Sequence, residues 1–363
     1  MKVISLKTEN FRNLTAREYN PGGGVNIICG ENGLGKTNLI ESIWLFTGCR
    51  SFRTIKDKDV IRFGQNEAKL KMEFFSGSRN KEAEIKIDDK RHFSLNGINL
   101  PSGRKMMGEF TSVVFTPLHL SIIKEGPEER RKFLDIALSQ LKPNYAKTIL
   151  EYSKALRQRN ATLHAAKENP AMLAMLDIWD AELAKKGSII IDSRMNYLEK
   201  LKDFACTAYD EISSGKETLE LRYKEYAREK AQGRKEIAES LMKALYEKRQ
   251  TDIEHCTTSV GAHREDFSVE LSGKSARQFG SQGQQRSAAL SLKLAEADII
   301  TQVTGEEPVI LLDDVFSELD PQRQKYLVKH FENRQVFITC CDEENISRIA
   351  DLDFTVERLE NGE

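Results

Sequence analysis

Apolar and polar residues alternate near the start of the chain, which predicts β-strands. Val3, Ile4 and Leu6 alternate with polar neighbours, and later segments repeat the pattern or form short apolar runs. The Asn96-Gly97 dipeptide that follows them predicts a tight hairpin turn. The first hundred residues are therefore expected to be mainly β. The later strands are predicted at 25–29, 70–75 and 84–87.

The hydrophobic period becomes helical after Gly126-Pro127. A proline at a first helical position, followed by acidic residues and by apolar residues up to Leu141, predicts one helix. Apolar faces between residues 143 and 170, and again from 172 toward 201, predict two long antiparallel helices. A short strand at 219–223 and a charged helix at 237–245 complete this middle part.

Strand and helix alternate again after residue 267, which is typical of a parallel sheet. We therefore predict an α/β fold in which both ends of the chain build one sheet-containing lobe. The middle would be an inserted, mostly α-helical second lobe. The predicted boundaries are 1–115 plus 255–363 for the first lobe and 116–254 for the second.

Composition narrows the class of protein. The chain has 363 residues, 39% hydrophobic and 31% charged, and 55 basic against 56 acidic residues give a net charge of −1. These values exclude a disordered tail protein and a bulk polycation, so any contact with nucleic acid has to be a local patch. No apolar run approaches the roughly 18 residues of a membrane span, and the six cysteines form no C-x-x-C pair. We expect a cytoplasmic protein with no membrane partner, disulfide framework or zinc site.

Residues 30–37 match the pattern G-x-x-x-x-G-K-[ST], between an apolar run and a helix-like segment. This is the context of a phosphate-binding (Walker A) loop, in which glycines let backbone N–H groups converge on phosphate oxygens. Lys36 is expected to reach the β- and γ-phosphates of ATP, and Thr37 to ligate Mg²⁺. The alternative is a glycine-rich turn without a ligand. The residues predicted to contact the nucleotide are Gly30, Glu31, Asn32, Gly33, Leu34, Gly35, Lys36, Thr37 and Asn38.

Four apolar residues at 309–312 run into Asp313 and Asp314, as in a buried parallel strand that delivers acids at its C-terminal end. Asp313 is expected to hold Mg²⁺ through a water molecule. Asp314 is expected to polarise the attacking water, so Asp314 and Lys36 are the predicted catalytic residues. An ordinary strand that runs into a turn would look the same, but the phosphate loop upstream favours the catalytic interpretation.

A third motif lies at 281–286, with the sequence Ser-Gln-Gly-Gln-Gln-Arg before an apolar helix. A serine hydroxyl, a glycine and the first amides of a helix can bind an anion, although they also fit a capped helix without a ligand. The motif lies about 30 residues before the acidic strand, where ABC-type ATPases carry their signature motif.

These three motifs, in this order, resemble the ABC-type ATPase heads of the SMC class. Further details resemble the RecF family of bacterial recombination mediators, and the resemblance covers nearly the whole chain. The matching segments are Asn10-Phe11-Arg12-Asn13, 30–41, Arg50-Ser51-Phe52-Arg53, Gly126-Pro127, 130–135, Arg159-Asn160, Gly261 with His263-Arg264, and 281–286.

The resemblance implies a protein of recombinational repair that dimerises with ATP on gapped or double-stranded DNA, and that also binds single-stranded DNA. It implies a slow, DNA-stimulated ATPase that acts as a switch, with RecR, RecO and RecA as partners. It also implies that Arg12 contacts the nucleotide, and that Ser281, Gly283 and Gln284 contact the nucleotide of a partner subunit.

The chain departs from the family pattern at four places. Asp314 stands where many ABC ATPases have glutamate, and Thr339-Cys340-Cys341 stands where they often have a switch histidine. Both departures predict slow hydrolysis. Leu118-His119 replaces an expected acidic pair, and Ala262 stands where proline is expected; we assign neither position a role.

Five basic residues around Phe52 face only two aspartates, which gives residues 50–62 a local charge of +3. Such a segment can follow DNA phosphates by charge alone, and the alternative is a solvated face. Two other functions stay open. A transporter-type ATPase subunit is disfavoured by the missing histidine and the helical insert, and a structural ABC protein would bind ATP without turnover. The candidate DNA-contacting residues are Arg50, Arg53, Lys56, Lys58 and Arg62.

Overall fold

The computed structural model describes residues 1–54, 56–225, 233–316, 319–340 and 354–359. The chain forms two compact units. The first contains Met1–Leu120, Thr207–Lys216 and Arg286–Glu363, and the second contains Ser121–Cys206 and Glu217–Gln285. Helices α5 (Ala174–Ser213) and α9 (Gln282–Thr304) each contribute residues to both units.

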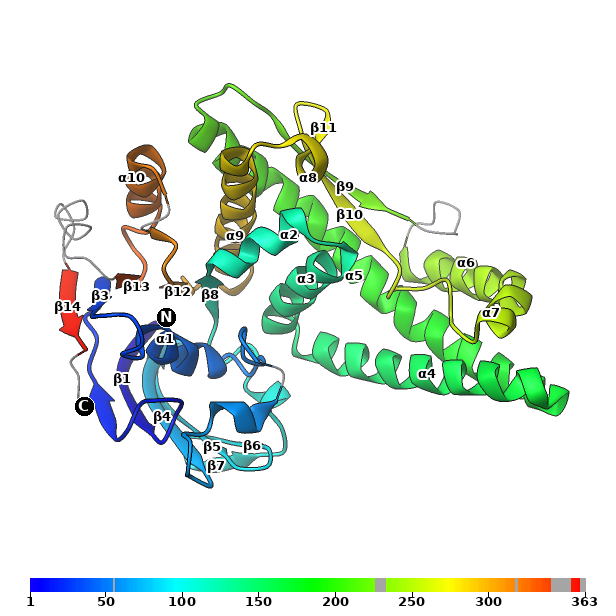
Figure 1. The fold of residues 1–363 in the computed structure, drawn as a ribbon, viewed down its shortest axis with the longest axis horizontal. Helices are drawn as coiled ribbons and strands as arrows, with labels where there is room; N and C mark the ends of the chain where they lie inside the picture. The colour runs from blue at the N-terminus through cyan, green and yellow to red at the C-terminus, as the bar shows by residue number, and fades with distance from the viewer. Residues whose placement is uncertain (55, 226–232, 317–318, 341–353, 360–363) are drawn as a thin grey trace. The chain divides into compact units, whose positions relative to one another are not determined.

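The first unit holds a six-stranded antiparallel sheet built from the beginning of the chain (Figure 1). Its strands alternate buried and more exposed side chains, as the polar pattern predicted. Asn96 and Gly97 have φ angles of 50° and 75° and close the last hairpin, which confirms the predicted turn. In sheet order the strands are β2 (Arg17–Tyr19), β1 (Lys2–Glu9), β4 (Ala68–Ser76), β5 (Arg79–Ile87), β6 (Arg91–Leu95) and β7 (Ile98–Leu100).

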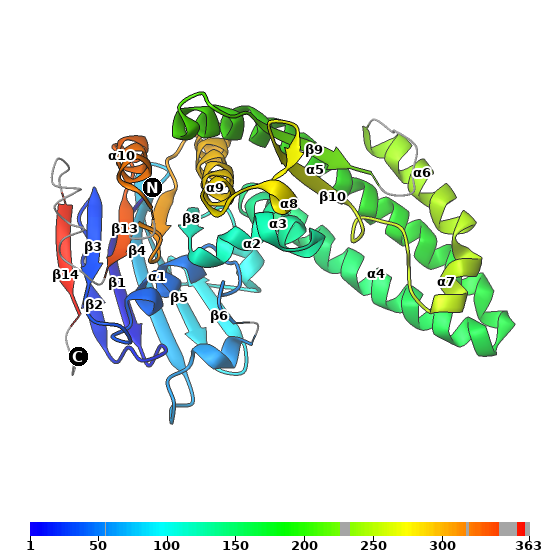
Figure 2. The same cartoon turned by 45° about the horizontal axis from the view of Figure 1, so that its top comes forward.

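The first unit also holds a five-stranded sheet in which every pair of neighbours is parallel. It combines strands from both ends of the chain, so the prediction that both ends build one sheet-containing lobe is confirmed. Figure 2 shows β14, β3 and β13 side by side. The order is β14 (Phe354–Arg358), β3 (Val25–Cys29), β13 (Val336–Cys340), β12 (Val309–Leu312) and β8 (Ser112–Phe115).

Helix α1 (Lys36–Leu45) follows β3 and lies between the two sheets of this unit (Figure 1). Eight of its ten residues are buried, including the charged Lys36 and Glu41, as expected for a helix that is covered on most of its sides. The remaining short elements of this unit are η1 (Asp57–Val60), η2 (Gly103–Lys105), η3 (Pro117–Leu120) and α10 (Pro321–His330).

The second unit is mostly helical, and its two long helices are the predicted antiparallel pair. Lys186 Nζ of α5 lies 2.6 Å from Glu151 Oε2 of α4 (Pro143–Glu168), while Arg159 Nε of α4 lies 2.6 Å from Asp180 Oδ1 of α5. The pairing runs in opposite directions, so the helices are antiparallel. No helix among the described residues is long and apolar enough to cross a membrane. The helices are α2 (Ser121–Lys124), α3 (Pro127–Leu141), α4 (Pro143–Glu168), η4 (Pro170–Leu173), α5, α6 (Gly233–Glu247), α7 (Arg249–His255) and α8 (Ala276–Phe279).

The unit boundaries differ from the predicted ones in three places, the smallest being residues 116–120, which group with the first unit and not with the helical one. Residues 255–285, predicted to belong to the ATPase lobe, group with the helical unit because β10 (Asp266–Leu271) pairs antiparallel with β9 (Leu219–Lys224) and with β11 (Lys274–Ser275). Strand β10 therefore belongs to a three-stranded antiparallel sheet and not to the parallel sheet of the first unit. The third difference is that Thr207–Lys216, at the end of α5, groups with the first unit.

A candidate nucleotide-binding and hydrolysis site

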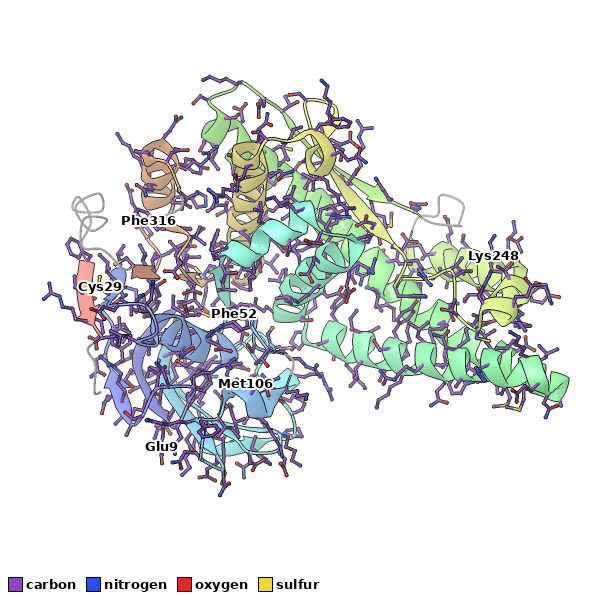
Figure 3. The ribbon with its side chains drawn as sticks, in the orientation of Figure 1. Glu9, Cys29, Phe52, Met106, Lys248 and Phe316 are labelled. Atoms are coloured by element: carbon purple, nitrogen blue, oxygen red, sulfur yellow. The ribbon has the colours of Figure 1, made fainter. Side chains whose placement is uncertain are left out.

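The glycine-rich loop lies between Cys29 at the end of β3, labelled in Figure 3, and the start of α1. Gly30, Gly33 and Gly35 have φ angles of 152°, 91° and 103°, a region that glycine adopts readily and other residues rarely adopt. At Gly35 a Cβ would also lie 2.6 Å from Asn13 Oδ1. The loop conformation therefore depends on glycine, as the motif predicts.

Lys36 begins α1 and is almost completely buried. Its ammonium group donates hydrogen bonds to the carbonyl oxygens of Gly30, at 2.6 Å, and of Glu31, at 3.0 Å. The cation thus points back along the loop at the N-terminal end of a ten-residue helix, where the backbone also presents partial positive charge. This arrangement suits the binding of a phosphate group.

The acidic strand β12 ends beside this loop. Thr37 Oγ1 donates a 2.7 Å hydrogen bond to Asp313 Oδ1, although the two residues are 276 positions apart in the sequence. Burial raises the pKa of Asp313, and the hydrogen bond from Thr37 opposes that rise. Asp314 follows with a left-handed φ of 54°. The structure therefore brings together both predicted magnesium ligands and the predicted catalytic carboxylate.

The donor set fits Mg²⁺. Hydroxyl and carboxylate oxygens are the ligands this cation prefers, and it usually keeps several of its waters. A buried carboxylate whose pKa is raised by loss of solvent is one that a nearby cation would stabilise. No group of three or more His, Cys, Asp or Glu side chains suited to an all-protein metal site occurs within the described parts of the chain.

Glu41 is a buried residue whose carboxylate contacts Arg12 and Arg53, two residues with predicted binding roles. The sequence patterns did not single it out. Its carboxylate accepts hydrogen bonds from Arg12 Nε at 3.0 Å and Arg12 Nη2 at 2.8 Å, and one from Ser51 Oγ. Arg53 Nη1 lies 3.5 Å from the same carboxylate. Arg12 also donates to the backbone oxygen of Asp59. The Arg12 guanidinium is thus fixed on α1 and η1, and its contact with a nucleotide stays a prediction.

Asn13 is a second residue that the patterns missed, although it lies in the matching Asn10–Asn13 segment. Asn13 Nδ2 donates to the Gly33 oxygen at 2.8 Å, and Asn38 Nδ2 donates to Asn13 Oδ1 at 2.6 Å. Asn38 Oδ1 in turn accepts a 2.6 Å hydrogen bond from Arg53 Nη1. These amides hold the middle of the glycine-rich loop against α1.

The five candidate DNA-contacting residues do not form one uniform face. Arg50 and Lys56 are exposed. Lys58 pairs with Asp89, and Arg53 reaches inward to Asn38 and Glu41. The positive charge of Arg53 also lowers the pKa of Asp313, which opposes the larger effect of burial. Arg53 therefore belongs to the surroundings of the candidate site. Less of the positive charge of residues 50–62 is available for DNA phosphates than the sequence suggested.

The signature motif lies at the start of α9, and all of its residues except Arg286 group with the second unit. The Ser281 backbone N–H donates to Gln284 Oε1 at 2.7 Å, and the Gln284 N–H donates to Ser281 Oγ at 3.3 Å. This reciprocal pair is a capping box. Gln284 Nε2 also donates to Glu217. The capped helix expected as the simpler alternative is thus present, and Gly283 lies in its first turn.

The whole chain is similar to known proteins. A family model described as "RecF/RecN/SMC N terminal domain" matches residues 2–362. The DNA replication and repair protein RecF of Clostridium acetobutylicum is 39% identical over 366 residues, covering 100% of this chain and 99% of the relative. The chain belongs to the RecF family. A second RecF, from Clostridium tetani, is 38% identical over 365 residues, with 100% of this chain and 99% of the relative covered.

Solved structures agree with this family assignment. One, described as RecF-ATPrS in the RecFOR pathway, has a TM-score of 0.92 and 37% identity, covering 99% of this chain and 96% of its own. Another, described as RecF-ATP, has a TM-score of 0.88 and 39% identity, covering 94% and 92%. An Smc head domain from Pyrococcus furiosus, 14% identical with a TM-score of 0.56 and covering 99% and 94%, shares the fold alone. The predicted ABC/SMC-type ATPase head fold is confirmed.

The remaining departures from the RecF pattern have local explanations or none. His119 Nδ1 accepts a 2.9 Å hydrogen bond from the Thr116 N–H. Leu118 is exposed, and nothing in the described structure explains a leucine at this position. Cys340 Sγ lies 2.8 Å from Cys29 Sγ in the adjacent strand, so Cys340 is a buried packing residue. Cys341, like Ser317 and Glu318, lies outside the described residues.

Proposed function

We propose that this chain binds and hydrolyses ATP and uses that cycle in recombinational DNA repair. The observation that carries the proposal is the hydrogen bond of 2.7 Å between Thr37 Oγ1 and Asp313 Oδ1. It joins the loop that would hold the phosphates to the strand that would hold the cation. The names of the relatives, DNA replication and repair protein RecF, and of the RecF-ATP structure support the same conclusion.

Each part of the site has a separate task in the proposed reaction. The Lys36 ammonium exchanges its two carbonyl partners for phosphate oxygens, and the backbone N–H groups of the loop orient the same phosphates. Thr37 and Asp313 would hold Mg²⁺, which supplies charge neutralisation on the phosphates when bound. The Asp314 carboxylate accepts a proton from the attacking water. Its shorter side chain, in place of glutamate, supports a slow reaction suited to a switch.

Dimerisation completes the proposed cycle. We assign Ser281, Gly283 and Gln284 to the nucleotide of a second copy of the chain, which would make two composite sites in a symmetric dimer. The support is the family membership and the exposed position of Ser281. Arg12 and Arg53 would stabilise α1 through Glu41 and so keep the loop in position for ATP.

DNA and protein partners follow from family membership. We propose that ATP-bound dimers bind gapped or double-stranded DNA, and single-stranded DNA as well, and that DNA stimulates hydrolysis. RecR and RecO are proposed partners, since the solved relatives are described as part of the RecFOR pathway, and RecA is proposed from the family resemblance alone. Arg50, Lys56 and Arg62 are the remaining candidates for phosphate contacts from the basic segment, because Lys58 and Arg53 have carboxylate partners.

Two variants test the reaction. Lys36→Met removes the cation, so ATP affinity should fall at least about 100-fold, since a charged hydrogen-bonding partner in such a site typically contributes several kcal/mol. Lys105→Met, at an exposed lysine of the same unit, is the matched control. Asp314→Asn keeps the shape and an acceptor but removes the base. It should therefore bind ATP normally and release phosphate at least about 100-fold more slowly. Unchanged ATP affinity in Lys36→Met would contradict the phosphate-loop assignment.

The two alternative functions predict different results. A transporter-type subunit would sediment with membranes, while a repair protein would bind duplex DNA in the presence of ATP. A structural ABC protein would bind ATP but show no phosphate release with or without DNA. Sedimentation with vesicles, DNA mobility shifts and phosphate release therefore distinguish the three.

A further inference from the structure

Thr339 is a buried residue beside both acids of the candidate site, with 1% of its surface exposed. It lies near the end of β13, which pairs in parallel with the acidic strand β12. Its hydroxyl oxygen accepts a hydrogen bond of 2.8 Å from the Asp314 backbone N–H. The same hydroxyl lies 3.2 Å from Asp313 Oδ1 and 3.3 Å from Asp314 Oδ1. One side chain thus contacts the backbone of Asp314 and both carboxylates.

The backbone of Asp314 needs this kind of support. Its φ of 54° lies in the left-handed region, which costs conformational energy for a residue with a Cβ and persists where neighbouring contacts hold it. The Thr339 hydroxyl satisfies the N–H group of that residue and can donate its single proton to a carboxylate. The hydroxyl therefore ties the conformation of the backbone to the direction of the side chain.

The two carboxylates do not depend equally on Thr339. Asp313 Oδ1 also accepts the shorter hydrogen bond from Thr37 Oγ1, at 2.7 Å. Loss of the Thr339 hydroxyl would leave Asp313 anchored to the phosphate loop but would remove a support from the backbone and side chain of Asp314. The expected consequence falls on turnover more than on nucleotide binding.

We propose that Thr339 is a positioning residue for hydrolysis, which holds Asp314 in its left-handed conformation and aims its carboxylate. This inference rests on the proposed role of Asp314 as the base. The hydroxyl acts through Asp314 and does not itself take the proton of the attacking water.

Thr339→Val and Thr339→Ser are the decisive pair, because valine keeps the shape and loses the hydroxyl while serine keeps the hydroxyl. Hydrogen–deuterium exchange of the Asp314 amide, measured by NMR on nucleotide-free protein, reports the backbone hydrogen bond independently of activity. In Thr339→Val this amide should exchange about 10-fold faster or more, and phosphate release should slow about 10- to 100-fold, as expected for loss of a hydrogen bond to a charged group. ATP affinity should stay within about threefold of the original value, because Lys36 and Thr37 are unchanged. Thr339→Ser should restore both exchange protection and turnover.

The outcomes separate this inference from the proposed function. If Asp314→Asn is inactive while Thr339→Val turns over ATP at the original rate, the inference is wrong and the role of Asp314 stands. If Asp314→Asn retains full turnover, the proposed role of Asp314 fails and the inference fails with it. If valine and serine variants lose ATP affinity and thermal stability to the same extent, Thr339 has only a structural role, which also overturns the inference. Should Thr339→Val not fold, Thr339→Ala compared with Thr339→Ser gives the same test.

Discussion

Replacing Arg159 should destabilise the helical unit by an amount that its contacts predict. Its guanidinium is completely buried and lies 2.6 Å from both Asp180 Oδ1 and Asp252 Oδ2. Arg159→Met keeps much of the side-chain volume but removes the charge that two buried carboxylates share. Removing one partner from a buried ion pair typically costs about 3–5 kcal/mol, because the other charge is left without compensation.

After loss of the Arg159 charge, the carboxylates of Asp180 and Asp252 keep different hydrogen bonds. Asp180 Oδ2 keeps two hydrogen bonds from Arg249, at 2.8 and 2.6 Å. Asp252 keeps one hydrogen bond, from the Ser259 N–H at 3.0 Å, and loses its ion pair with Arg159. We therefore expect a loss near the lower end of the range, about 3–4 kcal/mol. For a unit of this size that corresponds to a fall of about 6–15 °C in the unfolding temperature.

Scanning calorimetry of the whole chain would measure this change. Arg157→Met, at an exposed arginine two positions earlier on the same helix, is the control and should stay within about 0.5 kcal/mol of the original stability. A loss below about 1 kcal/mol in Arg159→Met would refute the reasoning, since Asp252 would then have found another partner for its charge.

Three further predictions test other parts of the chain. Mixing Lys36→Met with Ser281→Arg chains should restore ATP-dependent cross-linking of dimers, which neither variant shows alone, because one heterodimer site then carries no lesion; no restoration at saturating ATP would count against a shared site. Burial lowers the pKa of His263 to about 4, so between pH 6.5 and 4 the unfolded chain binds a proton at this residue that the folded chain does not bind. Acidification over this range should therefore lower the free energy of unfolding by about 3 kcal/mol. Urea titrations at several pH values should show a smaller pH dependence of stability in His263→Gln. Gly48 and Gly64 have φ angles of 78° and 82°, but only at Gly48 would a Cβ lie 2.3 Å from a backbone oxygen, so thermal melts should show Gly64→Ala losing about 1 kcal/mol and Gly48→Ala at least twice as much.

Local features of the fold could be read from the sequence because they depend on neighbouring residues. The turn at Asn96-Gly97 needs two residues that tolerate positive φ, and asparagine and glycine are the residues that do so most readily. The loop before α1 and the strand before Asp313 are equally local. Helix α5 was predicted as far as Leu201 but continues to Ser213, because apolar residues keep helical spacing and no proline or glycine intervenes.

Pairing between distant segments could not be predicted in the same way. A strand such as β10 has the same alternation whether its partner is parallel or antiparallel, so its pairing with β9 was missed. Glu41 lies within the matching segment, yet nothing local says that Arg12 and Arg53 converge on its carboxylate. In the sequence, Thr339 stands out only because the segment Thr339-Cys340-Cys341 lacks the histidine often found there. Its contacts with Asp313 and Asp314 arise from the register of two parallel strands.

The order of the parallel sheet has a consequence for synthesis of the protein. Strand β3 ends at Cys29, but its two neighbours, β13 and β14, come from Val336–Cys340 and Phe354–Arg358, far later in the sequence. On the ribosome, both edges of β3 therefore stay unpaired until β13 and β14 have emerged, whereas β9, β10 and the long helices find their partners earlier. The phosphate loop that follows β3 is therefore expected to become ordered only after β13 and β14 have been made. Unpaired strand edges of this kind are aggregation-prone, so we expect the emerging chain to need its β3 edges covered until β13 and β14 have been made.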